Sequence, residues 1–324
     1  MTAAGRLAGA YEFLNDPAKA QQILTDVQAA GLKITPVNPF QTQKPFLTAT
    51  NQPISPHVGR IKILWASMRE DVISIVPLAQ ATPVNAVKYL ENVDEVYKTD
   101  AYNSLSIEGY KVTPELIARI RDSEWNPEGN PDDKQQIDAM AAKGYLEAFK
   151  VVKSSIGDIL GGQKASAVVH RDLQKWYRAL FSPSVDAGLL EPYHLAGYRN
   201  APVYINRSRH VPPSSTAVVD AMEALFDLFD QESNAAVRAV LGHFIFVYIH
   251  PYRDGNGRIG RFLMNTMLAA GGYPWTVIRV SRKDEYLQAL ETASVGGDIR
   301  QFAKFIVDEM EISSKAAAGT TGPA

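Results

Sequence analysis

The chain has 324 residues, of which 46% are apolar and 21% are charged, so it can bury a full hydrophobic core and has the balance of an ordinary globular protein. Its formal charge of −2 argues against a general affinity for nucleic acid or an anionic membrane, and no apolar run approaches the length that crosses a bilayer. The sequence contains no cysteine, which excludes disulfides and thiolate metal sites. Because the first residues also lack the apolar region of a signal peptide, we expect a cytoplasmic protein.

Helical patterns separated by glycine and proline fill the first half of the chain. Asp16 and Pro17 suit the N-cap and the first turn of a helix that ends before Gly31. Repeated prolines in residues 32–58 predict an extended connector, and residues 125–133 predict a turn-rich loop. Further helices are expected at about 59–75, 84–99, 114–122, 133–154 and 168–180.

Residues 197–213 interrupt the helical pattern. Val203, Tyr204 and Ile205 favour a strand, the residues after them favour a turn, and two prolines end the unit, so the sequence predicts a small β-hairpin. The tail at residues 313–324 is small and polar, and we expect it to be disordered. The remaining helices are expected at about 214–230, 233–248, 257–270, 282–294 and 298–312. The predicted fold class is therefore all-α with one small β-hairpin.

The most informative segment is HPYRDGNGRIGR at residues 250–261, which lies between two apolar helical stripes. We expect a tight loop that runs directly into the N-terminus of the second helix, where free N–H groups and the positive end of the helix dipole attract anions. Gly255 and Gly257 allow the backbone to curl so that successive amides point the same way. The segment therefore has the features of a phosphate-binding loop.

Four polar side chains of this segment add the other parts of a nucleotide site. Arg258 and Arg261 lie three residues apart on one helix face, where they can bind further phosphate oxygens. Asp254 lies beside the loop and is suited to hold a Mg²⁺ ion that bridges phosphates. His250 can accept a proton near neutral pH.

Three other interpretations compete with this one. A polar turn between two helices explains the glycines but not the arginines and the histidine. A G-x-G-x-x-G pattern that begins at Gly255 matches a dinucleotide-binding fingerprint, but residues 250–254 intervene where a strand should run into the first glycine. A zinc site from His243, His250 and Asp254 has the spacing of no familiar ligand pair, and a core role for His243 is favoured.

Residues 250–261 closely resemble the signature of Fic-domain proteins, H-x-F-x-[D/E]-G-N-G-R-x-x-R, with Tyr252 in place of the usual Phe. Residues 197–213 resemble the flap hairpin of that family, and residues 286–306 resemble its closing helices. Ser294 stands where relatives often have an asparagine near the adenine, which leaves the base preference open. The positions that carry the signature are His250, Tyr252, Asp254, Gly255, Asn256, Gly257, Arg258 and Arg261.

An upstream segment resembles the inhibitory motif of the same family, [S/T]-x-x-x-E-[G/N]. Ser104, Glu108 and Gly109 fill its fixed positions. A glutamate followed by a glycine is also an ordinary helix end. Beside an intact signature, the resemblance implies an inhibitory role in which Glu108 pairs with Arg261 where the γ-phosphate would lie.

The resemblance implies transfer of AMP from ATP to a Ser, Thr or Tyr hydroxyl of a protein, self-AMPylation included. His250 would take the proton of the target hydroxyl, and Asp254 would hold Mg²⁺. The flap residues Val203, Tyr204 and Ile205 would hold the target by strand pairing. The residues that would bind the nucleotide are Gly255, Asn256, Gly257, Arg258 and Arg261.

Two alternatives stay open: the same site could remove AMP from a modified protein through Glu108, or the chain could be a non-catalytic, nucleotide-sensing interaction protein. The expected partner is a protein substrate and neither nucleic acid nor a membrane, and the sequence leaves homo-oligomerisation open. The expected division is a helical N-terminal region of unassigned role at residues 1–95, a Fic domain at residues 96–312 with an inhibitory helix near residues 102–109, and the tail at residues 313–324.

Overall fold

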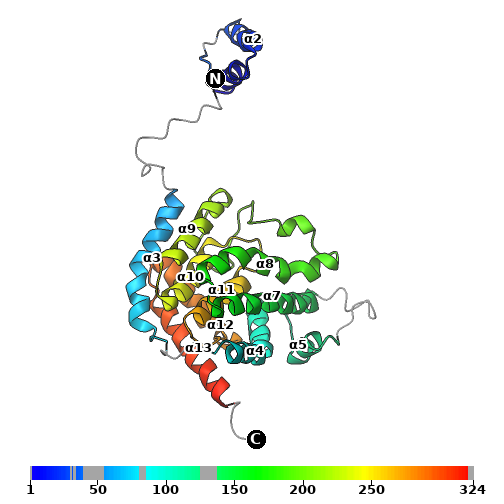
Figure 1. Ribbon diagram of the computed structural model, residues 1–324, viewed down its shortest axis with the longest axis vertical. Helices are drawn as coiled ribbons and strands as arrows, with labels where there is room; N and C mark the ends of the chain where they lie inside the picture. The colour runs from blue at the N-terminus through cyan, green and yellow to red at the C-terminus, as the bar shows by residue number, and fades with distance from the viewer. Residues whose placement is uncertain are drawn as a thin grey trace. The chain divides into compact units, whose positions relative to one another are not determined.

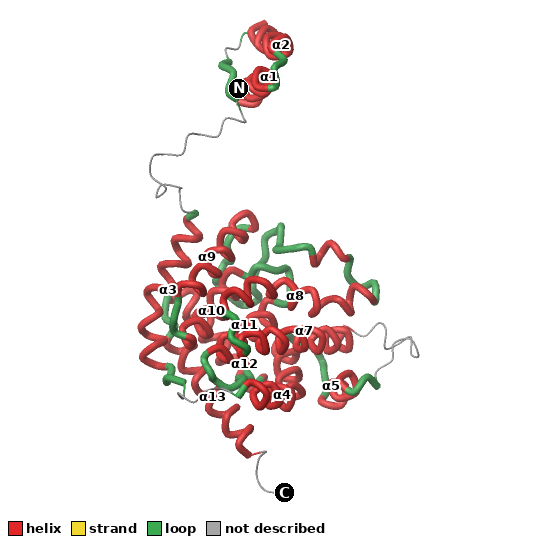
Figure 2. The backbone as a smooth tube through the Cα atoms, in the orientation of Figure 1, coloured by secondary structure: helices red, strands yellow, loops and turns green. Residues whose placement is uncertain are grey.

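The computed structural model describes residues 2–29, 31, 34–38, 55–79, 85–124 and 137–319. Within these ranges the regular elements are all helices, and none is a strand (Figures 1 and 2). None of the helices in these ranges combines the length and the apolar composition that a membrane span requires. The chain divides into two compact units, Met1–Ile54 and Ser55–Ala324, and each is described by itself.

The first unit contains two helices that pack together, α1 (Thr2–Phe13) and α2 (Pro17–Ala29). The predicted N-cap of the second helix is confirmed, because Asp16 Oδ1 accepts the N–H of Lys19 at 3.2 Å. The first helix was not predicted, since Gly5 and Gly9 weaken its helical pattern. Both glycines let the chain near Val37 approach closely: its N–H donates to the carbonyl of Gly5 at 2.9 Å, and a Cβ on Gly9 would lie 2.3 Å from the Val37 backbone.

The second unit is built around two neighbouring helices that are almost fully buried, α10 (Ala235–Ile249) and α11 (Asn256–Ala270). Apolar residues continue around all sides of α10, which is the pattern of a central helix. The surrounding helices are α3 (Pro56–Ile75), α4 (Ala86–Ile107), α5 (Pro114–Arg121), α7 (Ile137–Leu160), α8 (Ala165–Asp186), α9 (Val218–Gln231), α12 (Lys283–Gly296) and α13 (Arg300–Gly319). Short 3₁₀ turns occur at η1 (Pro192–Leu195), η2 (Ser215–Ala217) and η3 (Val280–Arg282).

The two central helices are covered on different sides. Helices α3, α9 and α13 contact α10, whereas α4, α7 and α8 contact α11. Figure 2 shows α3 and α9 on one side of the central pair and α7 and α8 on the other. This arrangement brings the C-terminal end of α4 to the N-terminal half of α11, and it leaves the loop at residues 250–255 between two rigid helices.

The β-hairpin predicted for residues 197–213 is wrong, because this segment contains no strand. It forms an extended loop whose turn is closed by Ser208, which donates its N–H to the carbonyl of Ile205 at 3.1 Å, with Arg207 at a φ of 61°. An isolated pair of strands is marginally stable without a third strand or a packed face. The described part of this helical unit offers no sheet for such a pair to join.

Other boundaries also differ from the sequence-based expectations. The division between units falls after Ile54 and not at residue 95, because α3 packs on the second unit. Helix α4 runs without a break to Ile107, so the helix expected at 84–99 and the inhibitory helix expected near residues 102–109 form a single element. The expected disordered tail is wrong for residues 313–319, which complete α13. The loop expected at residues 125–133 lies outside the described residues, as does the end of the tail.

Candidate active site

The loop between α10 and α11 is held in a fixed curve by its own side chains. His250 ends α10 in the left-handed conformation at a φ of 52°, and Gly255 precedes α11 at a φ of 80°. Asn256 Oδ1 accepts the N–H of Tyr252 at 2.9 Å, and its Nδ2 donates to the carbonyl of the same residue at 2.9 Å. The Asn256 side chain is therefore used within the loop, where it fixes the backbone conformation.

Tyr252 anchors this loop to the neighbouring helix α8. Its ring is buried and stacks on Tyr177, with the ring centroids 3.7 Å apart. Its hydroxyl donates to Gln174 Oε1 at 3.1 Å. The aromatic residue at this signature position thus fixes the loop against α8.

Asp254 is the one acidic side chain of the loop, and it is well exposed. Its Oδ1 accepts the N–H of Gly255 at 2.6 Å, and its Oδ2 accepts from Arg258 Nη2 at 3.0 Å. Among the described residues no group of three His, Asp or Glu side chains could hold a metal ion by itself. Mg²⁺, however, commonly binds one carboxylate together with substrate phosphates and water, so an exposed Asp254 fits that ion.

Arg258 is almost fully buried, and neighbouring aromatic rings hold its guanidinium in place. Its guanidinium lies over the rings of Tyr110 and Phe181, at 5.0 and 5.1 Å from their centroids. Its Nε is buried and has no hydrogen-bond partner in the described part of the chain. A buried donor without a partner is unfavourable, so this arginine has a donor to offer to an incoming anion.

Arg261 is joined to the C-terminal end of α4 by three hydrogen bonds. Its Nε donates to Ser104 Oγ at 2.8 Å, and its Nη2 donates to the Ser104 carbonyl at 3.0 Å and to Glu108 Oε1 at 2.6 Å. The arginine is buried, and the glutamate side chain is only 28% exposed. The structure therefore brings together Ser104, Glu108 and Arg261, as the inhibitory resemblance implies.

The Glu108 carboxylate lies directly against the first turn of α11. A Cβ on Gly257 would be 2.2 Å from Glu108 Oε1, so only glycine leaves room for the carboxylate there. Burial would raise the pKa of Glu108, but the positive charges of Arg261 and Arg258 outweigh it and hold the pKa below the usual 4.5. An ionised carboxylate thus occupies the helix N-terminus that the sequence predicts to bind anions.

A glycine-dependent cap places this glutamate. Glu108 is the C-cap of α4, and Gly109 follows it at a φ of 93°. The N–H of Tyr110 donates to the carbonyl of Leu105 at 3.2 Å, and the N–H of Gly109 donates to that of Ser106 at 3.1 Å. This is the Schellman arrangement, in which a left-handed glycine closes the last turn of a helix.

Two contacts from η3 and the first residue of α12 hold the same helix end. Lys283 Nζ donates to the carbonyl of Ile107, and the N–H of Val280 donates to Asn103 Oδ1 at 2.9 Å. A cation at the carbonyl end of a helix is favoured by the helix dipole. Neither contact was predicted, because the two segments lie more than 170 residues apart in the chain.

His250 has a defined proton arrangement. Its Nδ1 lies 3.3 Å from the carbonyl of Val247, and because a carbonyl only accepts, Nδ1 carries the proton and Nε2 is left as the base. Burial lowers the pKa of His250 below 6.5. The imidazole is therefore neutral at physiological pH, the state that a general base needs.

The competing interpretations do not fit the structure. The segment before Gly255 is helix α10 and not a strand, so the dinucleotide-binding interpretation is wrong. His243 is fully buried, its Nε2 lies 2.8 Å from the Tyr286 hydroxyl, and its ring stacks on Phe302. Its core role is confirmed.

The predicted flap residues lie on an exposed loop. Tyr204 is 80% exposed, while Val203 and Ile205 are half-buried. The buried Arg199 lies at the start of this loop, and the sequence pointed to it only as part of the flap resemblance, without a role of its own. Its side chain donates to backbone carbonyls on both the loop and the end of α10.

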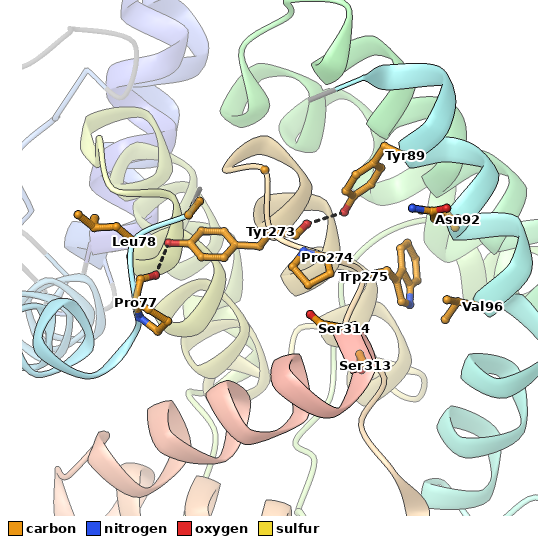
Figure 3. A pocket seen from close by; sticks show the side chains of 13 residues that line it. Pro77, Leu78, Tyr89, Asn92, Val96, Tyr273, Pro274, Trp275, Ser313 and Ser314 are labelled. Atoms are coloured by element: carbon orange, nitrogen blue, oxygen red, sulfur yellow. Dashed lines mark hydrogen bonds between the residues drawn. The ribbon is translucent and has the colours of Figure 1, made fainter. Parts of the chain in front are cut away.

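Two cavities of the second unit help to locate the site. The cavity in Figure 3, of about 410 Å³, lies between α4 and α13, with Tyr89 and Tyr273 joined across it by a 3.0 Å hydrogen bond. Its lining contains no residue of the signature. A cavity of about 280 Å³ adjoins the signature loop, and Tyr177, Arg199 and Arg253 are among its lining residues.

Comparison with known proteins places these features in a family. Residues 168–268 match the Fic/DOC family. The chain is 30% identical over 247 residues to Protein adenylyltransferase Fic of Nematostella vectensis, covering 74% of this chain and 54% of that protein. It is 30% identical over 220 residues to the protein of the same name from Drosophila willistoni, covering 66% of this chain and 40% of that one. The chain thus spans about half the length of the curated relatives it matches.

Solved structures show the same fold. Fic-1 (residues 134–508) from C. elegans superposes with a TM-score of 0.58 at 20% identity, covering 97% of this chain and 86% of that one. A Fic family protein from Desulfovibrio desulfuricans G20 superposes with a TM-score of 0.55 at 21% identity, covering 87% of this chain and 78% of that one. At these identities the likeness concerns the fold alone.

Proposed function

The chain carries a Fic domain, and from that premise we propose that it transfers AMP from ATP to a Ser, Thr or Tyr hydroxyl of a protein. The observation that carries the proposal is the ionised Glu108 carboxylate on the first turn of α11, bound to Arg261. A side-chain anion held in this place indicates that the surrounding N–H groups and arginines form an anion site. The triphosphate of ATP is the anion that such a site would take when Glu108 leaves.

In this reaction the target hydroxyl oxygen attacks the α-phosphorus of ATP. His250 Nε2 takes the hydroxyl proton as the bond to the β-phosphate oxygen breaks and pyrophosphate leaves. Arg258 and Arg261 hold phosphate oxygens, and the backbone around Gly255 and Gly257 supplies N–H groups. A Mg²⁺ ion held by Asp254 would neutralise the charge of the departing pyrophosphate.

The extended loop supports a role in target binding. Residues 203–205 lie in a loop with no strand partner in the described chain, and the Tyr204 side chain is 80% exposed. A target segment can pair with such a backbone by strand addition, which gives register more than sequence selectivity. We therefore assign Val203, Tyr204 and Ile205 to target docking.

The same geometry supports autoinhibition. Arg261 cannot hold Glu108 and a γ-phosphate at once with the same Nη2 group. ATP that binds beside Glu108 would have its phosphates displaced, and a displacement of about 1 Å can lower a rate about a hundredfold. Removal of the carboxylate should free the site.

The test compares the parent chain with Glu108→Gly in the presence of Mg²⁺ and ATP labelled in its α-phosphate. We expect strong label incorporation, into the chain itself or into proteins of a lysate, only after the substitution. Glu95→Gly, at an exposed position of the same helix, is the matched control for helix destabilisation and should behave as the parent. Equal labelling of the parent and the Glu108→Gly protein would reject autoinhibition.

A second variant tests the chemistry itself. Adding His250→Ala to the Glu108→Gly protein should remove transfer but keep ATP binding, measured by calorimetry. The imidazole is not part of the phosphate nest, by which we mean the backbone of residues 255–257 together with Arg258 and Arg261. Turnover that survives in the double variant would remove His250 from the role of base.

A further inference from the structure

One buried arginine joins the candidate base to the extended loop. Arg199 is only 4% exposed. Its Nε donates to the carbonyl of His250 at 2.8 Å and its Nη2 to that of Ile249 at 3.4 Å. On its other side, Nη1 donates to the carbonyl of Ala201 at 3.0 Å and Nη2 to that of Pro213 at 2.5 Å.

The backbone of the same residue adds a fifth contact. The N–H of Arg199 donates to the carbonyl of Pro251 at 2.8 Å. Three successive carbonyls, from residue 249 to residue 251, are therefore bound by this one residue. The Ile249 carbonyl is the last of α10 and has no partner within the helix, and a cation at this helix end is favoured by the helix dipole.

The composition of this contact is unusual for a buried charge. In the described part of the chain no carboxylate forms an ion pair with Arg199, so the guanidinium is neutralised only by carbonyl dipoles. Buried charges are expensive unless they are fully hydrogen-bonded. Only the planar fork of arginine can reach carbonyls on two sides at once, which lysine cannot do.

The conformation of His250 shows what this contact holds. A left-handed φ of 52° is uncommon for a histidine and persists only where the surroundings enforce it. Its N–H donates to the carbonyl of Phe246 at 3.0 Å, and its own carbonyl is held by Arg199. The main chain of the base is thus fixed on both sides.

The far end of the extended loop is tied to the same helix. His210 Nε2 lies 2.8 Å from the carbonyl of Tyr248, and the ring stacks on that tyrosine. The loop that carries residues 203–205 therefore has both ends fastened at the end of α10, next to the base.

We propose that Arg199 is a positioning residue that keeps the His250 base and the target-docking loop in a fixed relation, so that a docked hydroxyl meets Nε2. This inference rests on the proposed function, because it assigns a role in that reaction. Arg199 touches neither phosphate nor target; it acts through the carbonyls that it binds.

The pKa of His250 distinguishes a positioning role of Arg199 from a role in stability alone. Burial has the largest effect on the pKa of His250 and lowers it; the charges of Arg199 and His210 lower it further, and Glu108 raises it. Removing the charge of Arg199 should therefore raise the pKa of the base. A substitution that only loosened the fold would expose the imidazole and would change the pKa of His250 equally in variants that keep and variants that lose the positive charge at position 199.

The test uses Arg199→Gln and Arg199→Lys in the full-length Glu108→Gly protein. We expect kcat for label incorporation to fall about tenfold to a hundredfold in both, with KM for ATP unchanged, because the phosphate nest is intact. Histidine NMR, with the signal assigned through His250→Gln, should show the ring titrating at higher pH in Arg199→Gln but as in the Glu108→Gly protein in Arg199→Lys. Arg238→Gln is the matched control, since this partly buried arginine donates to the carbonyl of Glu232 near the start of α10.

The outcomes are distinct. Rates and titrations equal to those of the Glu108→Gly protein would overturn the inference, as would an equal rate loss in Arg238→Gln at an equal loss of melting temperature. If the Glu108→Gly protein itself incorporates no label, the proposed function fails, while the His250 titration still tests whether Arg199 acts on this ring. Guanidinium ion should partly restore Arg199→Ala, and a failure to do so in a folded variant would also count against the inference.

Discussion

At the level of single residues, the proposed inhibition depends on competition between a side-chain carboxylate and a phosphate for the same arginine. Glu108 offers Arg261 one strong, charge-assisted hydrogen bond at 2.6 Å. Ser104 supplies two further acceptors, so the guanidinium keeps its orientation when the carboxylate leaves. The arginine is thus oriented in advance for whichever anion arrives, and the balance between them depends on Glu108.

We predict that Glu108→Gln lowers the free energy of unfolding by about 2 kcal/mol at neutral pH, because one hydrogen bond to a buried cation loses its charge. The folded pKa of Glu108 lies below 4.5, so the stabilisation is present above that pH and is lost as the pH falls through the folded pKa. The difference between parent and variant should therefore shrink in acid. Thermal denaturation across a pH series measures it.

The same variant should respond more strongly to nucleotide. MgATP should raise the melting temperature of Glu108→Gln more than that of the parent, because the phosphates meet less competition. Glu311→Gln is the control, since Glu311 is exposed and only loosely paired with Lys315 at 3.9 Å. Equal shifts in parent and Glu108→Gln would contradict competition for Arg261.

A second residue-level prediction concerns the base. In the Glu108→Gly protein, transfer should be independent of pH at about pH 7 and above, because burial keeps His250 neutral there. The rate should fall in acid with a midpoint below 6.5, and removing Glu108 lowers this midpoint further because its charge raises the pKa of the ring. A pH–kcat profile measures the midpoint, and a value above 6.5 would show that another group limits the reaction.

Much of the candidate site is readable from the sequence at this scale, because its residues are chemically specific and closely spaced. The segment from His250 to Arg261 and the motif ending at Gly109 are local patterns. Asn256 is different: its amide fastens the loop at Tyr252, which a motif position alone cannot reveal. The anchoring contacts of Arg199 were not predicted for a related reason, since its partners are backbone carbonyls, which no sequence pattern identifies.

At the level of elements, the position of Glu108 depends on where helix α4 ends, and the C-terminal cap sets that end. The sequence predicts one helix at about 84–99 and a separate inhibitory helix near residues 102–109, because the polar run after residue 99 lacks a clear apolar stripe. In the structure those polar side chains are buried by bonds to distant segments, such as Asn103 to the N–H of Val280 and Ser104 to Arg261. Tertiary partners therefore extend the helix to Ile107 and carry Glu108 to the site.

We predict that Gly109→Ala loosens this end and partly relieves inhibition. A Cβ at a φ of 93° costs about 1 kcal/mol or more, which the chain can avoid by opening the last turn of α4. Opening shifts Glu108 away from Arg261, and a change of about 1 kcal/mol corresponds to an increase in basal transfer of about fivefold. Basal label incorporation measures the effect.

Gly162→Ala provides the control for that substitution. Gly162 ends α7 at a φ of 103° in the same arrangement, with the N–H of Gln163 bonded to the carbonyl of Asp158 at 3.0 Å. It should lose similar stability without any gain in transfer. Equal gains in both variants would mean that general destabilisation, and not the position of Glu108, controls the activity.

The absence of the hairpin expected at residues 197–213 shows that strand propensity alone does not predict a strand. Residues 203–205 have the composition of a strand, but a strand needs a partner as well as a propensity. The loop is instead held at its base by side chains, among them Ser208, Arg199 and His210, and Tyr204 near its tip is exposed. Strand propensity at the tip then suits a partner supplied by another molecule.

At the level of the whole molecule, the division between units was misplaced for a reason of sequence distance. The two units divide after Ile54, within the proline-rich segment expected to be a connector, most of which lies outside the described residues. Helix α3 follows it and has no distinctive feature in the sequence, because its partners are on α9, α10 and α13, which lie far later in the chain. Trp65 packs edge-on against Phe229 at 6.1 Å, and Arg69 Nε donates to Glu232 Oε2 at 2.7 Å.

Two truncations therefore have opposite expected outcomes. A chain that begins at Ser55 keeps every contact of the second unit and should melt cooperatively at the same temperature as that unit in the full chain, with Glu108→Gly still activating it.

A chain that begins at residue 96, the boundary expected from sequence, loses all of α3 and the first half of α4. Burial of Ile61, Trp65, Met68 and Val72 alone contributes about 1.5–3 kcal/mol for each side chain, a sum comparable to the whole stability of an average domain. The shorter chain should be unfolded by circular dichroism, and a folded, active protein from residue 96 would show that α3 is an accessory to the catalytic unit and not part of its core.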